Sequence, residues 1–148
     1  MIEFKKAIFD EYTINQLIEL SKIWADENIS FGLIPNSKDD LKEPCFIALD
    51  NNKIVGYIFG HYYEENKKRS YISVGEKCFD VDELYVLERY RSQGIGKKLF
   101  KMLEDEVKDK VVYITLATST KNYHKILKFY DEEVGMTFHN AFLIKKMN

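Results

Sequence analysis

Several features that would point to a specialised protein are scarce in this chain. There are only two cysteines, Cys45 and Cys78, and three scattered histidines, which do not form the pattern of a disulfide framework or a metal site. The 22 basic side chains do not exceed the 24 acidic ones, so no positive excess indicates a nucleic-acid partner. No apolar run approaches the roughly 20 residues of a membrane span, and the N-terminus lacks a signal-peptide pattern. These absences predict a cytoplasmic protein that binds neither membrane nor resident metal.

The remaining composition is that of an ordinary globular domain. Of the 148 residues, 45% are hydrophobic and 31% are charged, so we expect one domain over residues 1–148 with one core. Aromatic residues make up 14% of the chain. Tyr57, Tyr62, Tyr63 and Tyr71 lie close together in sequence, and such a cluster can belong to the core or line a pocket.

Hydrophobic periodicity predicts strands and helices in alternation. Segments rich in β-branched and aromatic residues predict strands over residues 2–8, 44–49, 53–63, 71–74, 81–87, 111–117, 136–139 and 141–147. Apolar residues three and four apart predict helices over residues 13–28, 94–108 and 123–134, with a helical turn near 37–41. We therefore expect an α+β domain, in which a mixed, mostly antiparallel sheet of about seven strands is flanked by about four helices.

Two further expectations concern local structure. Thr13 and Gln16 stand at the spacing of a capping box, which predicts that the Thr13 hydroxyl caps the first helix. The charged connection over residues 64–70 is expected to be solvated and mobile.

The segment Arg91-Ser92-Gln93-Gly94-Ile95-Gly96 carries the most specific signal in the sequence. It lies between a predicted strand and a predicted helix, where free backbone N–H groups at the positive end of the helix can bind phosphate. Gly94 and Gly96 lack a Cβ, so ligand oxygens can approach the main chain closely. Leu99 excludes the dinucleotide fingerprint, and Lys98 excludes the nucleotide-triphosphate loop. Two glycines can also simply begin a helix and bind nothing.

The pattern Arg/Gln-x-x-Gly-x-Gly/Ala, between a strand and a helix, resembles the coenzyme A pyrophosphate loop of the GNAT family of N-acetyltransferases. The order of the predicted elements is similar to that family over nearly the whole chain, although the close match covers about residues 81–107. A weaker match is Leu127-Lys128-Phe129-Tyr130 followed by Gly135-Met136. The interval from Tyr130 to Gly135 is one residue longer than is usual in the family, which leaves the position of Tyr130 open. The resemblance implies a GNAT-like fold and an acetyl-CoA-dependent N-acetyltransferase.

The resemblance also implies where acetyl-CoA, as co-substrate, would bind. In the family, the strand before the loop diverges from its neighbour, and a main-chain amide there stabilises the thioester oxygen. The amide of Val86 is the predicted donor here, and the pyrophosphate would lie on the amides of the loop. The predicted cofactor-binding residues are Leu84, Tyr85, Val86, Arg91, Ser92, Gln93, Gly94, Ile95, Gly96, Lys97 and Asn122.

Acetyl transfer to an amine also requires a base for the amine and an acid for the departing thiolate. The resemblance favours Glu83 as the base over Asp80 and Asp82, with a structural carboxylate as the alternative. Strand alternation predicts that Glu83 faces away from Asp80 and Asp82. Tyr130 is the predicted general acid, although it lies on the apolar stripe of its helix and could belong to the core. Neither cysteine has an evident activating histidine, so we expect direct attack in a ternary complex.

Three functions remain open at this point. The first is acetylation of a small cationic amine, such as a polyamine or an aminoglycoside-like compound, in a pocket formed by residues 24–33, the late helix, and Tyr62, Tyr63 and Glu64. The second is acetylation of a protein N-terminus or lysine. The third is an acyl-CoA-binding sensor without turnover. The acceptor, the acyl-chain preference and the oligomeric state, monomer or homodimer, also remain open.

Overall fold

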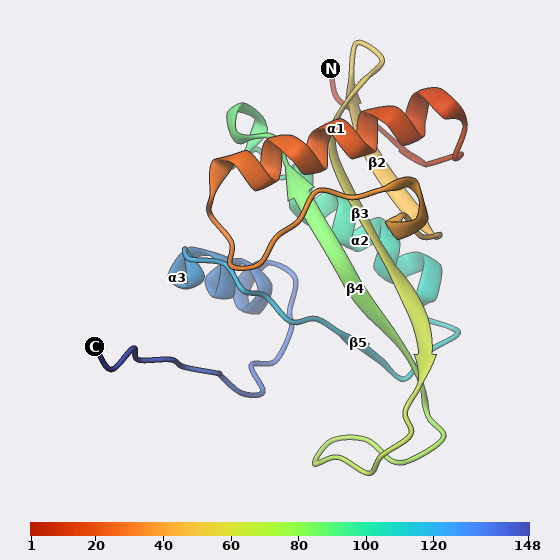
Figure 1. Ribbon diagram of the computed structural model, residues 1–148. Coiled ribbons are helices and arrows are strands. Elements are labelled where there is room, and N and C mark those ends of the chain that lie inside the picture. Colours follow the sequence, from red (N-terminus) through yellow and green to blue (C-terminus); the bar gives the residue numbers. More distant parts are fainter.

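Five strands form one mixed sheet with a long helix on each face (Figure 1). The computed structural model describes residues 1–148. In spatial order, the strands are β1 (Glu3–Lys6), β2 (Cys45–Asp50), β3 (Lys53–Glu64), β4 (Lys77–Val86) and β5 (Tyr113–Thr115). The α-helices are α1 (Glu11–Glu27), α2 (Ile95–Val107) and α3 (Tyr123–Lys128); the short turns are 3₁₀ turns η1 (Lys38–Asp40) and η2 (Glu88–Tyr90) and π-helical turn η3 (Phe129–Glu133).

Neighbouring strands are antiparallel except for β4 and β5, which are parallel. The predicted α+β fold with a mixed, mostly antiparallel sheet is therefore confirmed, with five strands instead of about seven and three α-helices instead of about four. None of the helices combines the length and apolarity that crossing a membrane would require.

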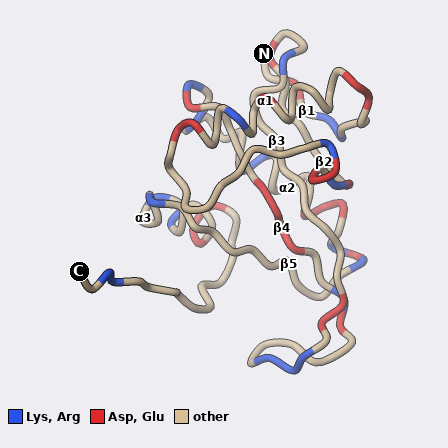
Figure 2. The backbone as a smooth tube through the Cα atoms, in the orientation of Figure 1, with Lys and Arg blue, Asp and Glu red and all other residues tan.

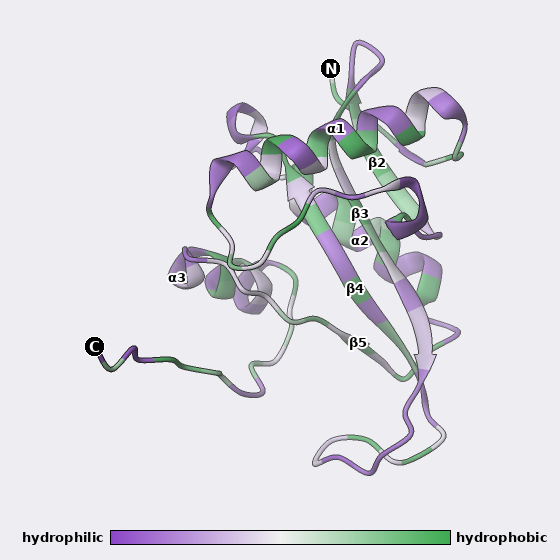
Figure 3. Ribbon diagram, in the orientation of Figure 1, coloured by the Kyte–Doolittle hydropathy of each residue, from purple (hydrophilic) through white to green (hydrophobic).

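Each face of the sheet has its own hydrophobic core. Figure 3 shows hydrophobic residues recurring along α1 between hydrophilic ones. On the α1 face, Leu17 and Leu20 pack against residues of β2 and β3. On the α2 face, the helix buries a stripe at three- and four-residue steps: Ile95, Leu99, Phe100, Leu103 and Val107. The apolar face predicted for this helix from its three- and four-residue spacing is therefore confirmed as its buried face.

The first helix begins two residues before the predicted cap. Asp10, not Thr13, is the N-cap, because its carboxylate accepts a hydrogen bond of 2.8 Å from the Thr13 N–H. Gln16 does not fold back to complete a capping box. Its side-chain oxygen instead accepts a hydrogen bond of 2.8 Å from the Ile54 N–H and ties α1 to β3.

A β-bulge in β4 changes which acidic side chains share a face. Phe59 of β3 pairs with Glu83, but the next residue of β3 pairs with Val81, so Asp82 is an extra residue. A bulge of this kind shifts the alternation of side chains by one position. Glu83 therefore lies on the α1 face together with Asp80 and Asp82, and the predicted placement on opposite faces is wrong.

Gly60 stands opposite this bulge and allows the two strands to approach closely. A Cβ at this position would lie 2.0 Å from the Asp80 carbonyl oxygen and 2.7 Å from the Phe79 ring. Both neighbours belong to the interior of the sheet, so no flexible side chain could give way.

Beyond the first half of β4, the sheet opens. The parallel pairing with β5 is limited to Cys78–Asp80, whereas β4 continues to Val86 with no neighbour on that side. Figure 1 shows the chain after β5 running toward α3 and away from β4. The outer edge of β4 from about Val81 onward is therefore free to bind a ligand.

The strands predicted over residues 71–74, 136–139 and 141–147 are absent, and β5 is shorter than the predicted 111–117. Residues 134–148 have no helix or strand, and the C-terminal segment leads away from the sheet (Figure 1). Phe142, Leu143 and Ile144 are exposed there. Alternating polarity produces a strand only where it can pair with an edge, and the outer edge at β5 spans just three residues.

Candidate active site

The start of α2 presents a run of unpaired main-chain donors. Ser92 and Gly94 have positive φ angles of 62° and 82°, which curl the chain before the helix. No side chain caps the helix, its first turn has no acidic residue, and the N–H groups of residues 92–97 have no hydrogen-bond acceptor within the protein. Six amides at the positive end of a 13-residue helix form a site suited to a diphosphate.

Arg91, at the first position of the motif, does not point into this run of amides. Its Nε donates to the Val86 carbonyl at 2.8 Å, and its Nη2 contacts both carboxylate oxygens of Glu27 at 2.8 Å. The guanidinium also lies 5.5 Å from the centre of the Tyr85 ring. The Arg91 side chain therefore anchors the loop to α1 and β4, and its charge is already compensated.

Val86 lies at the open edge of β4. The following residue, Leu87, donates its N–H to the Val55 carbonyl of β3 at 2.9 Å. Hydrogen-bonded and non-hydrogen-bonded pairs alternate along an antiparallel ladder, so the Val86 N–H is directed away from β3 toward the open edge. Leu84 has the same orientation, whereas Tyr85 is buried on the α1 face, where its ring stacks on Trp24 at 4.9 Å.

Glu83 is held on the α1 face by two donors. The Tyr57 hydroxyl donates to Glu83 Oε1 at 2.7 Å, and the Asn36 side-chain amide donates to the same oxygen at 3.0 Å. Oε2 has no partner within the protein. Burial raises the pKa of Glu83 above its ordinary value, against the two hydrogen bonds, which lower it.

Sequence reasoning missed Asn36, because nothing local marks a loop residue as a neighbour of β4. The loop after α1 is fixed by a hydrogen bond of 2.9 Å from the Asn36 N–H to Ser21 Oγ, inside the α1 core. Asn36 follows the apolar residues Leu33, Ile34 and Pro35, and this local sequence gives no sign of the contact with Glu83.

The bulge assembles an acidic row on β4, which Figure 2 shows as a red stripe along the strand. Next to it, His61 Nδ1 lies 3.0 Å from both carboxylate oxygens of Asp82, and Lys42 Nζ lies 3.8 Å from one of them. One ligand atom from each of His61, Asp80 and Asp82 lies within 4.8 Å of the others, so this set could hold a metal ion. The spacing along the sequence gives no sign of such a set, because it spans two strands.

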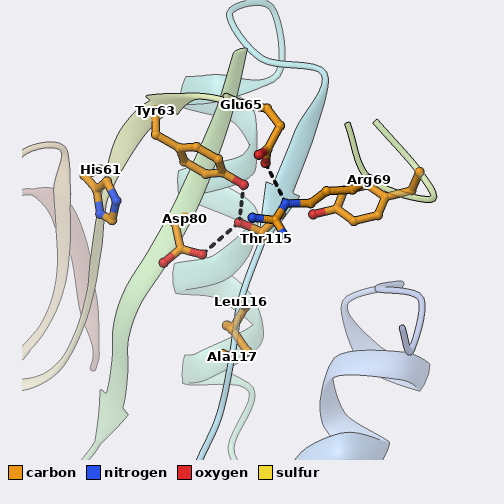
Figure 4. Close-up of a pocket in the computed structure, with 9 residues that line it drawn as sticks. His61, Tyr63, Glu65, Arg69, Asp80, Thr115, Leu116 and Ala117 are labelled. Carbon is orange, nitrogen blue, oxygen red and sulfur yellow. Dashed lines mark hydrogen bonds and ion pairs between the residues drawn. The ribbon is translucent and has the colours of Figure 1, made fainter. Parts of the chain in front are cut away.

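The acidic row continues into a cavity of about 360 Å³ at the far end of β3 and β4 (Figure 4). Thr115 Oγ1 donates to Asp80 Oδ1 at 2.8 Å and lies 3.0 Å from the Tyr63 hydroxyl. Because the single Thr115 proton is used on Asp80, Tyr63 must be the donor to Thr115. Of the predicted acceptor residues, Tyr63 lines this cavity, but Tyr62 packs edge-on against Phe79 of the other face.

Tyr130 lies in the π-helical turn η3. The turn accommodates the one extra residue between Tyr130 and Gly135, because a π-helical turn contains one residue more than an α-helical turn. The Tyr130 ring packs edge-on against Phe129 and Phe100 on the α2 face, and its hydroxyl makes no hydrogen bond within the protein. Burial raises the pKa of Tyr130 to about 12. The open edge of β4 therefore separates Tyr130 on one face from Glu83 on the other.

Asn122 immediately precedes α3, and its side chain is exposed and without a hydrogen bond. Phe129, from the turn after α3, approaches the start of α2 so closely that a Cβ on Gly96 would lie 3.4 Å from its ring. The late helix thus packs beside the run of free amides.

Comparison with known proteins adds to this geometry. The family model described as the Acetyltransferase (GNAT) family matches residues 6–136. No curated protein matches the chain.

Three solved structures are similar to the chain over almost its full length. An aminoglycoside acetyltransferase from an uncultured soil metagenomic sample, in complex with trehalose, is 19% identical with a TM-score of 0.68, over 99% of this chain and 97% of that one. A predicted acetyltransferase with acetyl-CoA from Clostridium acetobutylicum is also 19% identical, with a TM-score of 0.68 over 99% and 96%. A ribosomal-protein-alanine N-acetyltransferase from Brucella melitensis is 15% identical, with a TM-score of 0.64 over 99% and 100%. At these identities the likeness shows the shared fold.

Proposed function

Because this chain belongs to the GNAT family of acetyltransferases, we propose that it transfers the acetyl group of acetyl-CoA to a primary amine. One observation carries the proposal: six unpaired amides begin α2 directly after the strand whose outer edge is open. A diphosphate on those amides would place the rest of an extended coenzyme along the open edge, with its thioester near the Val86 N–H. The other predicted binding residues, Leu84 and Asn122, border the same path.

In the proposed reaction, the amine nitrogen attacks the thioester carbon directly. Glu83 accepts a proton from the ammonium group, directly or through a water molecule, because only the neutral amine is a nucleophile. The Val86 N–H stabilises the charge that develops on the carbonyl oxygen. The carbon–sulfur bond then breaks, and Tyr130 donates its proton to the departing thiolate. The attacking nitrogen releases its second proton to solvent, from which Tyr130 regains a proton. Its pKa of about 12 keeps Tyr130 protonated at neutral pH.

The negative charge on the α1 face of β4 favours a small cationic acceptor. Asp80, Asp82 and Glu83 follow one another on the α1 face, so a protonated amine would be attracted to the place where Glu83 can deprotonate it. One similar structure is an aminoglycoside acetyltransferase, whose substrates carry several amines. Acetylation of a protein N-terminus is the second candidate, and its support is the similar fold of the ribosomal-protein-alanine enzyme.

Calorimetry tests the coenzyme half of the proposal. We expect wild-type protein to bind coenzyme A with measurable heat, and Gly94→Val to abolish it. Gly94 has φ +82°, which a β-branched residue adopts only with strain, so valine would disturb the curl of the chain that presents the amides. Gly75→Val is the matched control, since Gly75 also has a positive φ, +91°, but lies in the loop between β3 and β4. Equal binding by wild type and Gly94→Val would refute the assigned phosphate site.

Thiol release with acetyl-CoA tests the chemistry. A panel of small cationic amines, neutral amines and peptides with free N-termini or lysines separates the two acceptor classes. Coenzyme binding without thiol release from any acceptor would indicate a sensor that does not turn over. Preference for neutral amines would overturn the cationic acceptor.

A further inference from the structure

The loop between β3 and β4 has hydrogen bonds of its own, while residues 66–70 are exposed, as predicted for the solvated connection over residues 64–70. Glu65 donates its N–H to the Glu76 carbonyl at 2.9 Å and accepts at its own carbonyl from the Gly75 N–H at 2.8 Å. Ile72 is buried, and the Arg69 N–H donates to its carbonyl at 3.0 Å. These hydrogen bonds and the buried Ile72 close the base of the loop, next to Glu65.

Within this loop, a buried carboxylate orients an arginine. The Glu65 side chain is only 5% exposed, and Glu65 Oε2 lies 3.1 Å from Arg69 Nε. The other carboxylate oxygen, Oε1, accepts a hydrogen bond of 3.2 Å from the Lys67 N–H. The pair fixes the guanidinium through Nε alone, and neither terminal amino group of Arg69 has an acceptor within the protein. Figure 4 shows the guanidinium extending over the cavity toward Thr115.

The cavity is lined by the Arg69 guanidinium, which is paired with Glu65, and by the Asp80 carboxylate. Arg69 provides two outward N–H₂ groups on one side, and Asp80 provides a half-buried carboxylate on the other. Tyr63, Tyr71 and Thr115 lie between them. From Asp80, the acidic row leads along the same face of β4 to Glu83, the proposed base.

We propose that Arg69 binds a carboxylate of the acceptor, so that the substrate is a dipolar molecule with an amine at Glu83 and a carboxylate at Arg69. The inference rests on the proposed function and refines it, because it adds an anionic group to the acceptor. A planar guanidinium with both terminal amino groups free matches a carboxylate with two parallel hydrogen bonds. A doubly charged phosphate is disfavoured, since Glu65 and Asp80 would repel it more strongly.

Three acceptors of equal length provide the test: 5-aminopentanoate, pentylamine and 1,5-diaminopentane. They share a primary amine and differ at the far end, which is negative, neutral or positive. We expect kcat/KM for the aminopentanoate to exceed that of the other two by about tenfold or more, as for a charge-assisted hydrogen-bonded pair. The shorter and longer homologues define the span between Glu83 and Arg69. A preference for the diamine would overturn the inference and leave the proposed function standing.

Arg69→Met is the diagnostic variant, and Lys68→Met is its control. Both changes remove one positive charge from the same loop, but Lys68 is exposed and has no partner there. We expect Arg69→Met to bring the ratio of aminopentanoate to pentylamine close to one and Lys68→Met to preserve it. An equal loss in both variants would mean general electrostatic attraction and would overturn the assigned contact.

Binding without turnover separates this inference from the proposed function. Saturation-transfer NMR with pentanoate, which cannot be acetylated, is carried out on wild type, Arg69→Met and Lys68→Met in the presence of coenzyme A. A signal that only Arg69→Met loses supports the carboxylate site even if no amine releases thiol. Absence of a signal in the wild type, with pentylamine still acetylated, overturns the site and keeps the enzyme.

Discussion

Replacing Glu83 by Gln tests whether Glu83 is the general base of the proposed reaction. Glutamine has nearly the same shape, and its amide oxygen can still accept the hydrogen bonds from Tyr57 and Asn36 that reach Glu83 Oε1. The change removes only the ability to accept a proton. General-base catalysis contributes about 10²- to 10⁴-fold, so we expect kcat/KM to fall by about that factor, while coenzyme A affinity stays unchanged.

The pH profile of the wild type follows from the direction of the pKa shift. Glu83 must be ionised to act as base, and burial raises its pKa, so activity should rise with pH through a midpoint above the ordinary value of 4.5. Glu83→Gln should lose this limb. Tyr57→Phe should move the limb to higher pH with a similar plateau, because it removes a donor that stabilises the carboxylate.

The assay is mass-spectrometric quantification of acetylated amine across pH, with thermal unfolding as the control for folding. A carboxyl whose pKa is raised in the folded state destabilises that state as the pH rises through its pKa, so a neutral glutamine should not lower the melting temperature at pH 7. A folded Glu83→Gln protein with wild-type rate and an unchanged acid limb would refute the assignment. Asp80 and Asp82 would then be the next candidates.

Two further predictions concern Tyr130 and Gly60. Tyr130→Phe keeps the ring packed against Phe100, so we expect turnover to fall far more than coenzyme A affinity. Steady-state kinetics measures the turnover, and calorimetry measures the affinity. Unchanged turnover would assign Tyr130 to the core alone. Gly60→Ala places a Cβ 2.0 Å from the Asp80 carbonyl oxygen, and we expect the free energy of unfolding to fall by about 3 kcal/mol or more in urea denaturation. A loss below about 1 kcal/mol would show that the bulge can relax.

Local chemistry explains what could be predicted from the sequence. The glycines of the loop and the apolar residues of α2 act through neighbours that are close in sequence. Their pattern therefore predicts both the free amides at the start of α2 and its buried face. Strands β2 and β3 are also specified by their own composition, and their predicted positions are confirmed. Strand β4 begins at Lys77, four residues before the predicted start at Val81.

The other features depend on contacts between distant segments. Asp82 is an extra residue next to the pair of Gly60 and Val81, where the two strands approach too closely for a Cβ, and that one insertion determines the face of Glu83. Asn36 and Arg69 reach the candidate site from loops whose positions are set by Ser21 and by Glu65. None of these relations leaves a periodic signal in the sequence.

The side chain of the motif residue Arg91 makes its contacts within the protein. Arg91 is one of the predicted cofactor-binding residues, and its side chain is paired with Glu27 and the Val86 carbonyl. Glu27 comes from the end of α1, and Val86 from the end of β4. The arginine therefore fixes the loop to the same strand that carries the proposed thioester donor. An extended coenzyme requires a rigid spacing between the free amides and the Val86 N–H, and we expect the Arg91 contacts to maintain that spacing rather than to bind phosphate.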